Sequence, residues 1–272
     1  MKKRQNRSRS GGSYSAVDIK QDRKRILGST TSFTTVEEYK TLRTNLIFST
    51  TEEGSKIIGI TSAESKEGKS ITCLNTAITF AEAGKKVIVL DCDLRLPTIS
   101  RLLGIRGTPG VSNLLVNINT LDETVQHVQL SRAAIDVIPS GDIPPNPSEL
   151  LGSDKMSSLL NALTGMYDYI FIDTPPVGAV SDAVVLSKML TGYIIVVRSG
   201  RTEQAALSNV LSQLEYAGAN LLGFVLNGIS EKELRRYGKY SYKYGKYRLY
   251  GRYRYYGQSL TSRDKPPADE EK

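Results

Sequence analysis

The sequence of 272 residues has no tryptophan, one histidine and two cysteines. Cys73 and Cys92 offer neither the spaced pairs of a disulfide framework nor the ligand spacing of a zinc site, so we expect two reduced thiols. No apolar run approaches the roughly 18 residues of a membrane-spanning helix, and the basic N-terminus lacks the apolar segment of a secretory signal. These absences predict a cytosolic, globular chain, long enough to bury a substantial core.

Charge is abundant but unevenly placed. Residues 1–25 carry nine basic and two acidic side chains, a net of +7, and residues 235–256 carry a net of +8. Residues 26–234 hold sixteen basic and twenty-two acidic side chains, a net of −6. The overall charge of +8 therefore describes two basic arms beside a mildly acidic body. Such arms suit nucleic acid, an anionic membrane surface or an acidic protein surface.

Short apolar runs begin at residues 57, 87, 135, 169, 193 and 221 and alternate with segments of helix length. Strands that are apolar on both faces and alternate with helices indicate a mostly parallel sheet that helices cover on both sides. The pattern predicts a doubly wound α/β fold. A helix before the first strand is expected to start at Thr34, which stands three residues before Glu37 in the spacing of a capping box.

The expected domain organisation has three parts. Residues 1–30 are expected to form a disordered basic arm, because they are rich in polar and basic residues and lack hydrophobic periodicity. Residues 31–233 are expected to form the folded domain. Residues 234–272 are expected to form a flexible tail that is rich in tyrosine and acidic at its end.

The segment TSAESKEGKS follows the first predicted strand and precedes an amphipathic segment that Gly84 closes. A strand, a loop ending in Gly-Lys-Ser and a helix are the parts of a phosphate-binding loop, in which backbone amides and the positive helix end hold phosphates. Lys69 is expected to reach the β- and γ-phosphates, and Ser70 to bind Mg²⁺. Ala63 stands at the first position of G-x-x-x-x-G-K-[ST], where glycine is usual. The residues expected to contact the nucleotide here are Glu67, Gly68, Lys69, Ser70 and Ile71.

Acidic residues end two further predicted strands. Asp91 and Asp93 follow VIVL, and Asp173 follows YIFI. Ligands of open parallel sheets bind at the carboxyl ends of the strands, so we expect these carboxylates to converge on the phosphate loop. Asp173 and one of Asp91 and Asp93 are expected to hold Mg²⁺ with Ser70, and the other to accept a proton from an attacking hydroxyl; which of the two is the base stays open. Arg95 has two equally weighted interpretations, a contact to the γ-phosphate or an ion pair with a carboxylate.

Nine of the fifteen tyrosines lie between Tyr237 and Tyr256, among arginine, lysine and glycine residues. Their spacing fits neither a helix nor a strand, and eight basic side chains oppose collapse. A phenol has a pKa of about 10 and therefore needs a positioned base before it attacks a phosphate. The predicted phosphoacceptors are Tyr237, Tyr240, Tyr242, Tyr244, Tyr247, Tyr250, Tyr253, Tyr255 and Tyr256.

Together these motifs resemble the bacterial tyrosine kinases of capsule and exopolysaccharide synthesis, whose fold is that of P-loop NTPases. The resemblance spans residues 33–257 and rests on the order of its parts. SAESKEGKS resembles Walker A, VIVLDCDLRLP Walker A′ and YIFIDTPP Walker B, with SGDIPPNPSELL between the last two and the tyrosine cluster at the end. The resemblance implies a protein-tyrosine kinase that uses ATP and Mg²⁺ and autophosphorylates its tail in trans.

The resemblance also implies partners: a ring-like homo-oligomer, a separate membrane-embedded activator protein, protein tyrosine substrates and a cognate phosphatase. The chain is then expected in the cytoplasm, at the inner face of the plasma membrane through its activator. The family's oligomer motif, E-x-x-R-x-x-R, falls on Glu37, Lys40 and Arg43, with lysine in place of the first arginine. Asn227 resembles the position from which relatives contact the adenine ring. Glu64 stands where the related partitioning ATPases carry a signature lysine, which favours a kinase.

Two alternatives stay open. One is a partitioning-type P-loop ATPase that hydrolyses ATP without modifying tyrosine. The other is a nucleic-acid binder whose basic, tyrosine-rich arms supply cationic and stacking contacts. The kinase interpretation is preferred because the tail supplies acceptors for the chemistry that the phosphate loop predicts, and it calls for no nucleic-acid partner.

Overall fold

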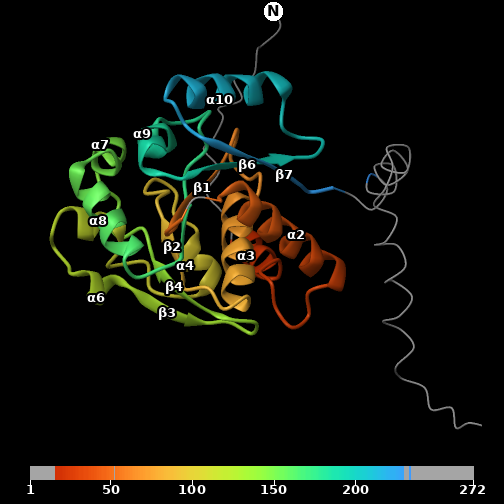
Figure 1. Ribbon diagram of the computed structural model, residues 1–272, viewed down its shortest axis with the longest axis horizontal. Helices are drawn as coiled ribbons and strands as arrows, with labels where there is room; N and C mark the ends of the chain where they lie inside the picture. Colours follow the sequence, from red (N-terminus) through yellow and green to blue (C-terminus); the bar gives the residue numbers. More distant parts are fainter. Residues whose placement is uncertain (1–15, 52, 230–232, 234–272) are drawn as a thin grey trace, which may run out of the picture. The chain divides into compact units, whose positions relative to one another are not determined.

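The computed structural model of the protein describes residues 16–51, 53–229 and 233 (Figure 1). The chain divides into a body, Met1–Asn227, and a second unit, Gly228–Lys272. At the centre of the body lies a seven-stranded sheet with the order β3-β4-β2-β5-β1-β6-β7. Its strands are β1 (Lys56–Ser62), β2 (Val87–Asp91), β3 (Gln126–Gln129), β4 (Ala134–Ile138), β5 (Tyr169–Asp173), β6 (Gly192–Arg198) and β7 (Leu221–Asn227).

The sheet confirms the predicted fold class. All six predicted strands are present, and every neighbouring pair is parallel except β3 and β4, which pair antiparallel. β3 is the strand that the sequence did not predict. Its Val128 is buried whereas His127 and Gln129 are exposed, so no apolar run marks it.

Helices cover both faces of the sheet (Figure 1). α2, α3 and α4 pack on one face, α5, α7 and α8 on the other, and α9 and α10 cover β6 on that second face. The helices are α1 (Ala16–Arg23), α2 (Phe33–Ser49), α3 (Lys69–Glu82), α4 (Ile99–Leu103), α5 (Val111–Leu115), α6 (Leu121–Thr124), α7 (Pro147–Leu151), α8 (Asp154–Thr164), α9 (Asp182–Leu186), the 3-10 turn η1 (Ser187–Met189) and α10 (Gln204–Tyr216). Within the described ranges, none of them is long and apolar enough to cross a membrane.

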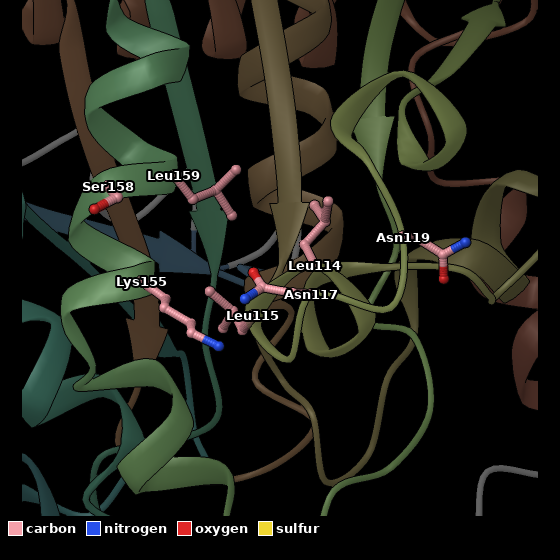
Figure 2. A pocket seen from close by; sticks show the side chains of 7 residues that line it. All are labelled: Leu114, Leu115, Asn117, Asn119, Lys155, Ser158 and Leu159. Carbon is pink, nitrogen blue, oxygen red and sulfur yellow. The ribbon is translucent and has the colours of Figure 1, made fainter.

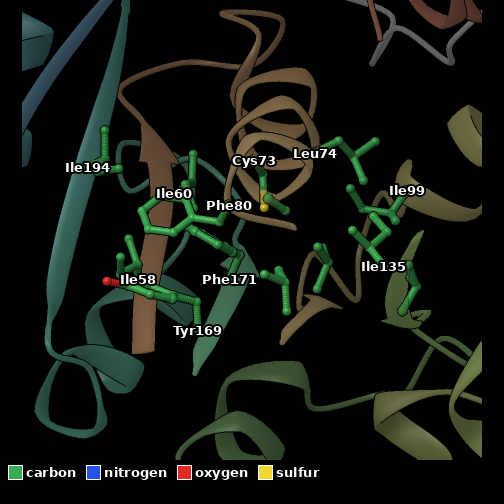
Figure 3. Close-up of a cluster of buried hydrophobic side chains, with 14 of the residues drawn as sticks. Ile58, Ile60, Cys73, Leu74, Phe80, Ile99, Ile135, Tyr169, Phe171 and Ile194 are labelled. Carbon is green, nitrogen blue, oxygen red and sulfur yellow. The ribbon is translucent and has the colours of Figure 1, made fainter. Parts of the chain in front are cut away.

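α3 is fixed to the sheet by an aromatic cluster at its C-terminal end (Figure 3). The ring centroid of Phe80 lies 4.2 Å from that of Tyr169 and 5.4 Å from that of Phe171, both on β5. Ile58 and Ile60 of β1 belong to the same buried cluster. Burying a side chain of this size stabilises a fold by about 1.5–3 kcal/mol, so the cluster holds α3 firmly along the central strands. Its N-terminus consequently stays at the carboxyl edge of the sheet.

The edge strand β7 departs from the expected pattern. Every residue of β1 is buried, whereas β7 alternates between exposed and half-buried positions. Phe224 is 50% exposed, and Leu221 and Leu226 are also exposed. Val225 packs on the α3 face, but the side of β7 that carries Phe224 is incompletely covered. The prediction of strands buried on both faces is therefore wrong for β7.

The segment before α2 is folded further upstream than expected. Residues 16–23 form α1, and the Arg23 guanidinium donates to the Arg101 carbonyl in α4. Leu27 is 1% exposed. The side chain of Asn75 in α3 makes two hydrogen bonds to the backbone of this segment. Its Oδ1 accepts from the Leu27 amide at 2.8 Å, and its Nδ2 donates to the Arg25 carbonyl at 2.9 Å. A disordered arm as far as residue 30 is thus not what the structure describes; residues 1–15 of that expected arm lie outside the described ranges.

α2 begins before its predicted start. The N-cap of α2 is Ser32, whose hydroxyl accepts from the Thr35 amide at 3.2 Å, so the helix begins earlier than the predicted Thr34.

Cys73 and Cys92 are both buried free thiols, as expected. Burial raises the pKa of both, which keeps them protonated and unreactive.

Candidate active site

The phosphate loop joins β1 to α3 and contains two residues with left-handed backbone. Lys66 has a φ of 64° and Gly68, the N-cap of α3, a φ of 101°. A Cβ atom on Gly68 would lie 2.0 Å from the Asn227 side-chain nitrogen, so both conformation and space require glycine here. Ala63 replaces the usual first glycine and is buried, with Gly178 placed so that its own Cβ would meet the Ala63 carbonyl at 2.5 Å.

The buried side chain of Glu67 stabilises the phosphate loop through hydrogen bonds. Its side chain is fully buried and accepts from the Glu64 amide at 3.0 Å, while the hydroxyl of Thr202 donates to its other oxygen. The Glu67 carbonyl accepts from the Asn227 side chain at 2.9 Å. Thr202 also accepts from the Arg198 amide at 2.8 Å, so the segment after β6 braces the phosphate loop.

Thr202 is a site residue that the sequence did not predict. It lies 135 residues beyond Glu67 in the chain, and no motif marks the contact. Asn227 was expected near an adenine ring; in the structure it contacts the phosphate loop itself, at Glu67 and Gly68.

Lys69 lies among the predicted carboxylates. Its Nζ is 2.9 Å from Asp93 Oδ2 and 3.6 Å from Asp173 Oδ1. Burial alone would lower the pKa of Lys69, but the Asp173 and Asp93 carboxylates outweigh it and hold the pKa above its usual value. Asp91 and Asp173 stand opposite each other in the register of β2 and β5. The strand ends therefore bring these residues together as expected.

Asp91 is fully buried and accepts backbone hydrogen bonds with both of its oxygens. Oδ2 accepts from the Thr98 and Ile99 amides at 3.2 and 3.0 Å, at the start of α4, and Oδ1 accepts from the Asp93 amide at 3.3 Å. Burial, and then the neighbouring Asp173 and Asp93 carboxylates, raise the pKa of Asp91 to about 8. These contacts give Asp91 a structural task in shaping the loop after β2.

Asp93 is 4% exposed, whereas Asp91 is fully buried. Besides its contact to Lys69, its Oδ1 accepts from the Leu96 amide at 3.0 Å. The carboxylate is thus oriented by one backbone amide and one cation. This orientation leaves lone pairs of both oxygens for further hydrogen bonds.

Asp173 is buried and, within the described part of the chain, both of its oxygens lack a hydrogen bond. Ser70 and Lys69 lie close to it, but neither meets normal hydrogen-bond geometry with it. Burial raises the pKa of Asp173 to about 6, although the Lys69 ammonium opposes the shift. A buried carboxylate without hydrogen-bond donors is costly unless a bound cation or ligand contacts its oxygens.

The residues present fit Mg²⁺. Among the described residues no three His, Cys, Asp or Glu side chains converge on a protein-only metal cage. Mg²⁺ rarely uses such cages, because it keeps several waters and takes one or two carboxylates together with substrate phosphates. The carboxylate of Asp173, which has no hydrogen bond among the described residues, and the hydroxyl of Ser70 beside it supply the oxygen ligands that this ion prefers.

Arg95 does not point to the phosphate loop. Its guanidinium donates to both oxygens of Asp182, at 2.8 and 2.9 Å, and to the Ser148 hydroxyl at 3.2 Å. Asp182 is fully buried and also accepts from Ser148 at 2.5 Å. Of the two interpretations of Arg95, the structure contains the ion pair. We call Arg95, Ser148 and Asp182 the Arg95 latch, since they join the loop after β2 to α7 and α9.

Other predicted residues lie away from the site or outside the described ranges. Ile71 is half-buried in the first turn of α3. On α2, Lys40 pairs with Glu37 at 2.8 Å and Arg43 donates to the Thr79 carbonyl at 2.6 Å, so all three side chains of the expected oligomer motif lie away from the phosphate loop. The nine tail tyrosines lie outside the described residues.

A separate pocket of about 310 Å³ opens between α5, the loop after it and α8 (Figure 2). Three leucines line it together with polar side chains and one cation, Lys155, whose side chain extends from α8 toward Leu115 in Figure 2. None of its lining residues is a predicted site residue. They are Leu114, Leu115, Asn117, Asn119, Lys155, Ser158 and Leu159.

The chain is similar in sequence and in structure to bacterial tyrosine kinases. A protein family described as an AAA domain matches residues 55–217. The tyrosine-protein kinase YwqD of Bacillus subtilis (strain 168) is 38% identical over 206 residues, which cover 76% of this chain and 85% of the relative. The solved kinase domain of the Escherichia coli tyrosine kinase ETK superposes with a TM-score of 0.69 at 35% identity, covering 73% of this chain and 77% of that one.

A more distant structural likeness exists to a septum site-determining protein. MinD from Pyrococcus horikoshii OT3, solved in complex with Mg-ADP, has a TM-score of 0.53 and 26% identity, with 65% of this chain and 73% of that chain covered. The chain is thus more similar to the kinase domain than to this ATPase in both sequence and structure.

Proposed function

This chain belongs to the bacterial tyrosine kinases, and we propose that it transfers the γ-phosphate of ATP to tyrosine hydroxyls, first to those of its own C-terminal cluster. Its P-loop ATPase fold implies nucleotide binding. The observation that carries the proposal is the placement of Lys69 between Asp93 and Asp173 at the end of the phosphate loop. A phosphoryl transfer site needs such a combination of one phosphate-binding cation, one base and one metal ligand.

The phosphate loop and Lys69 bind and orient ATP. Backbone amides between Gly68 and Ile71 point along the axis of α3, whose positive end favours the phosphates. Lys69 stays charged at neutral pH, so it can exchange its contact to Asp93 for the β- and γ-phosphates. That exchange frees Asp93 as ATP arrives.

We assign the general base to Asp93 and not to Asp91. Both oxygens of Asp91 accept backbone amides, Oδ2 those of Thr98 and Ile99 at the start of α4 and Oδ1 that of Asp93, whereas Asp93 is 4% exposed and, among the described residues, one of its oxygens contacts only the Lys69 ammonium. The phenolic oxygen of the tyrosine attacks the γ-phosphorus and forms a new O–P bond as the bond to the β,γ-bridging oxygen breaks. ADP leaves with that electron pair, and the phenolic proton passes to Asp93.

Ser70 and Asp173 would hold Mg²⁺, which neutralises charge on the β- and γ-phosphate oxygens when it is bound. Both oxygens of Asp173 lack a hydrogen bond among the described residues, which supports such a role. Asp91 then supports the site indirectly by fixing the loop that carries Asp93.

The cluster between Tyr237 and Tyr256 is the proposed acceptor in trans. Its net charge favours contact with a body of opposite charge, and its sequence places nine phenols on one short segment. Each phosphate adds about −1.5 to −2 charges, so modification reverses the charge of the tail. By this proposal the kinase domain includes α1 and the segment before α2, so it begins upstream of the expected boundary at residue 31, and residues 234–272 form its substrate tail.

The partners follow from the family assignment as proposals. We propose a ring-like homo-oligomer through Glu37, Lys40 and Arg43 on α2, although this structure satisfies all three within one chain. A separate membrane-embedded activator, further protein substrates and a cognate phosphatase complete the set, and the chain would lie in the cytoplasm at the inner face of the plasma membrane. The proposed cellular role is control of capsule or exopolysaccharide synthesis and export.

One assay tests the function. Wild type, Lys69→Met and a chain without residues 235–257 are incubated with Mg²⁺ and ATP, and phosphotyrosine is measured. We expect strong label in wild type, none in Lys69→Met and little in the truncated chain, with Lys85→Met in the exposed turn after α3 as an unaffected control. ATP hydrolysis without phosphotyrosine in wild type would instead support the partitioning-type ATPase, and salt-dependent nucleic-acid affinity lost with the tail would support the third alternative.

A further inference from the structure

Tyr216 is a tyrosine of the folded body that faces solvent. Its side chain is 96% exposed, and it is the last residue of α10. The end of α10 is well formed, because the Gly218 amide donates to the Glu215 carbonyl and the Ala219 amide to the Leu214 carbonyl, both at 2.9 Å. With Gly218 at a φ of 69°, these bonds form a Schellman motif, which fixes the backbone around Tyr216.

The other four tyrosines of the described body are engaged. Tyr193 is fully buried, and its hydroxyl donates to a backbone carbonyl at 2.6 Å. Tyr167 donates to a carboxylate at 2.7 Å. Tyr169 is 9% exposed and stacks on Phe171 in the aromatic cluster, and Tyr39 is half-buried and packs against Leu27, Val36 and Ile78. Of these five phenols, Tyr216 is the one that another protein can reach without unfolding the body.

Tyr216 lies at the opposite edge of the sheet from the phosphate loop. α10 begins just after Thr202, which contacts the loop, and its 13 residues extend about 20 Å away from it. It ends just before β7, whose first residues are at the amino edge of the parallel sheet. Figure 1 shows α10 lying across β6 and β7. A residue fixed on this helix cannot enter the site of its own chain.

We propose that Tyr216 is a phosphoacceptor on the folded body, modified by the active site of another copy of this chain. The proposal rests on the kinase function proposed above. The Tyr216 oxygen attacks the γ-phosphorus of ATP held by the second copy, ADP leaves with the electrons of the broken P–O bond, and the proton passes to Asp93 of that copy. Because Tyr216 cannot reach the site of its own chain, its modification reports intermolecular transfer alone.

Phosphorylation at this position has a local consequence. It places about −1.5 to −2 charges at the negative end of α10 and beside Glu215. Both interactions are repulsive, so the modified helix loses order in its last turn. The turn that leads into β7 is loosened with it.

The test uses two full-length chains. The donor is wild type; the acceptor carries Lys69→Met and phenylalanine at the nine tail tyrosines, and is labelled with ¹⁵N. After incubation with Mg²⁺ and ATP, the trypsin fragment of residues 202–232, in which Tyr216 is the one tyrosine, is analysed by mass spectrometry. The fragment of residues 156–188, with the engaged Tyr167 and Tyr169, is the matched control.

We expect phosphotyrosine on the heavy 202–232 fragment, at an initial rate proportional to donor concentration, none on 156–188, and loss of the label when the acceptor also carries Tyr216→Phe. Label on both fragments overturns the proposal, since it reports unfolded acceptor. Label on the donor tail with an unmodified heavy 202–232 fragment overturns the proposal and leaves the kinase function standing. Absence of phosphotyrosine everywhere, the donor tail included, overturns both.

Discussion

Two buried carboxylates, Asp173 and Asp182, are fully shielded from solvent yet have opposite surroundings. In the Arg95 latch, Asp182 accepts two hydrogen bonds from Arg95 and one from Ser148. In the phosphate-loop cluster, which we define as Lys69, Asp93 and Asp173, the described residues give Asp173 no hydrogen bond. Burial of a charge is tolerated in the first region because it is paired. In the second region Asp173 has the Lys69 ammonium at 3.6 Å but no hydrogen-bond donor, and we propose that Mg²⁺ supplies the missing contact.

The largest expected effect concerns the base of the phosphate-loop cluster. Asp93→Asn should lower the rate of tyrosine phosphorylation by about 10²–10⁴-fold, because the amide cannot accept the phenolic proton. The melting temperature should change little, because the variant side chain keeps an oxygen for the Leu96 amide and the weaker contact to Lys69 is offset by less repulsion among the buried carboxylates. Phosphotyrosine formation and thermal unfolding measure the two quantities, with Asp154→Asn on the exposed start of α8 as control. Full activity in Asp93→Asn would return the role of base to Asp91.

Asp182→Asn should destabilise the protein by about 3 kcal/mol. The neutral amide loses one acceptor and points an N–H group at the Arg95 guanidinium; the partial exposure of Arg95 keeps the loss at the low end of that for buried pairs. Urea unfolding measures the change, and Asp122→Asn on exposed α6 serves as reference. An unchanged midpoint would show that the two carboxylates differ less than their contacts indicate.

The same change at Asp173 should have the opposite sign in nucleotide-free, metal-free protein. Its pKa is about 6 when folded and about 4 when unfolded, so the wild type loses stability as the pH rises from about 4 to about 6. Asp173→Asn escapes this loss and should be more stable by on the order of 2 kcal/mol above pH 6, with no advantage below pH 4. Thermal unfolding from pH 4 to 8 in EDTA measures the difference. A pH-independent difference would contradict the raised pKa.

The smallest expected effect concerns Thr202, which contacts the phosphate loop at Glu67. Thr202→Val keeps the shape of the side chain but removes the hydroxyl that joins the Arg198 amide to Glu67. We expect KM for ATP to rise roughly fivefold, about 1 kcal/mol, with kcat little changed. Thr202→Ser should restore the wild-type KM. A serine variant as impaired as the valine variant would show that Thr202 acts through packing and not through its hydroxyl.

Much of the phosphate-loop cluster could be predicted from the sequence, for a physical reason. Parallel strands end at one edge, so an aspartate directly after an apolar run has its position fixed by the sheet. Asp91, Asp93 and Asp173 are predicted in this way and Lys69 from the phosphate-loop motif, and the geometry brings them together. The different tasks of Asp91 and Asp93 could not be predicted, since they depend on which carboxylate accepts the amides of α4.

The sequence could not predict which carboxylate Arg95 pairs with, nor the contacts that Thr202 and Asn227 make to Glu67. Arg95 finds its partner 87 residues away, on a helix of five residues that no periodicity marks. Thr202 and Asn227 reach Glu67 from two other elements, and each contact depends on a side-chain rotamer. The error at α2 is of a different kind: Ser32 and Thr34 are both good N-caps, and the spacing to Glu37 favoured the wrong one.

The side-chain amide of Asn75 limits where the chain can be truncated. It hydrogen-bonds to the backbone at Arg25 and Leu27, so α3 and the segment before α2 form one packed unit. A fragment trimmed to begin at residue 31 would uncover both ends of that amide and the apolar patch that Leu27 seals. The smallest autonomous kinase fragment therefore starts upstream of residue 25, and a tether attached there pulls directly on the nucleotide-binding helix.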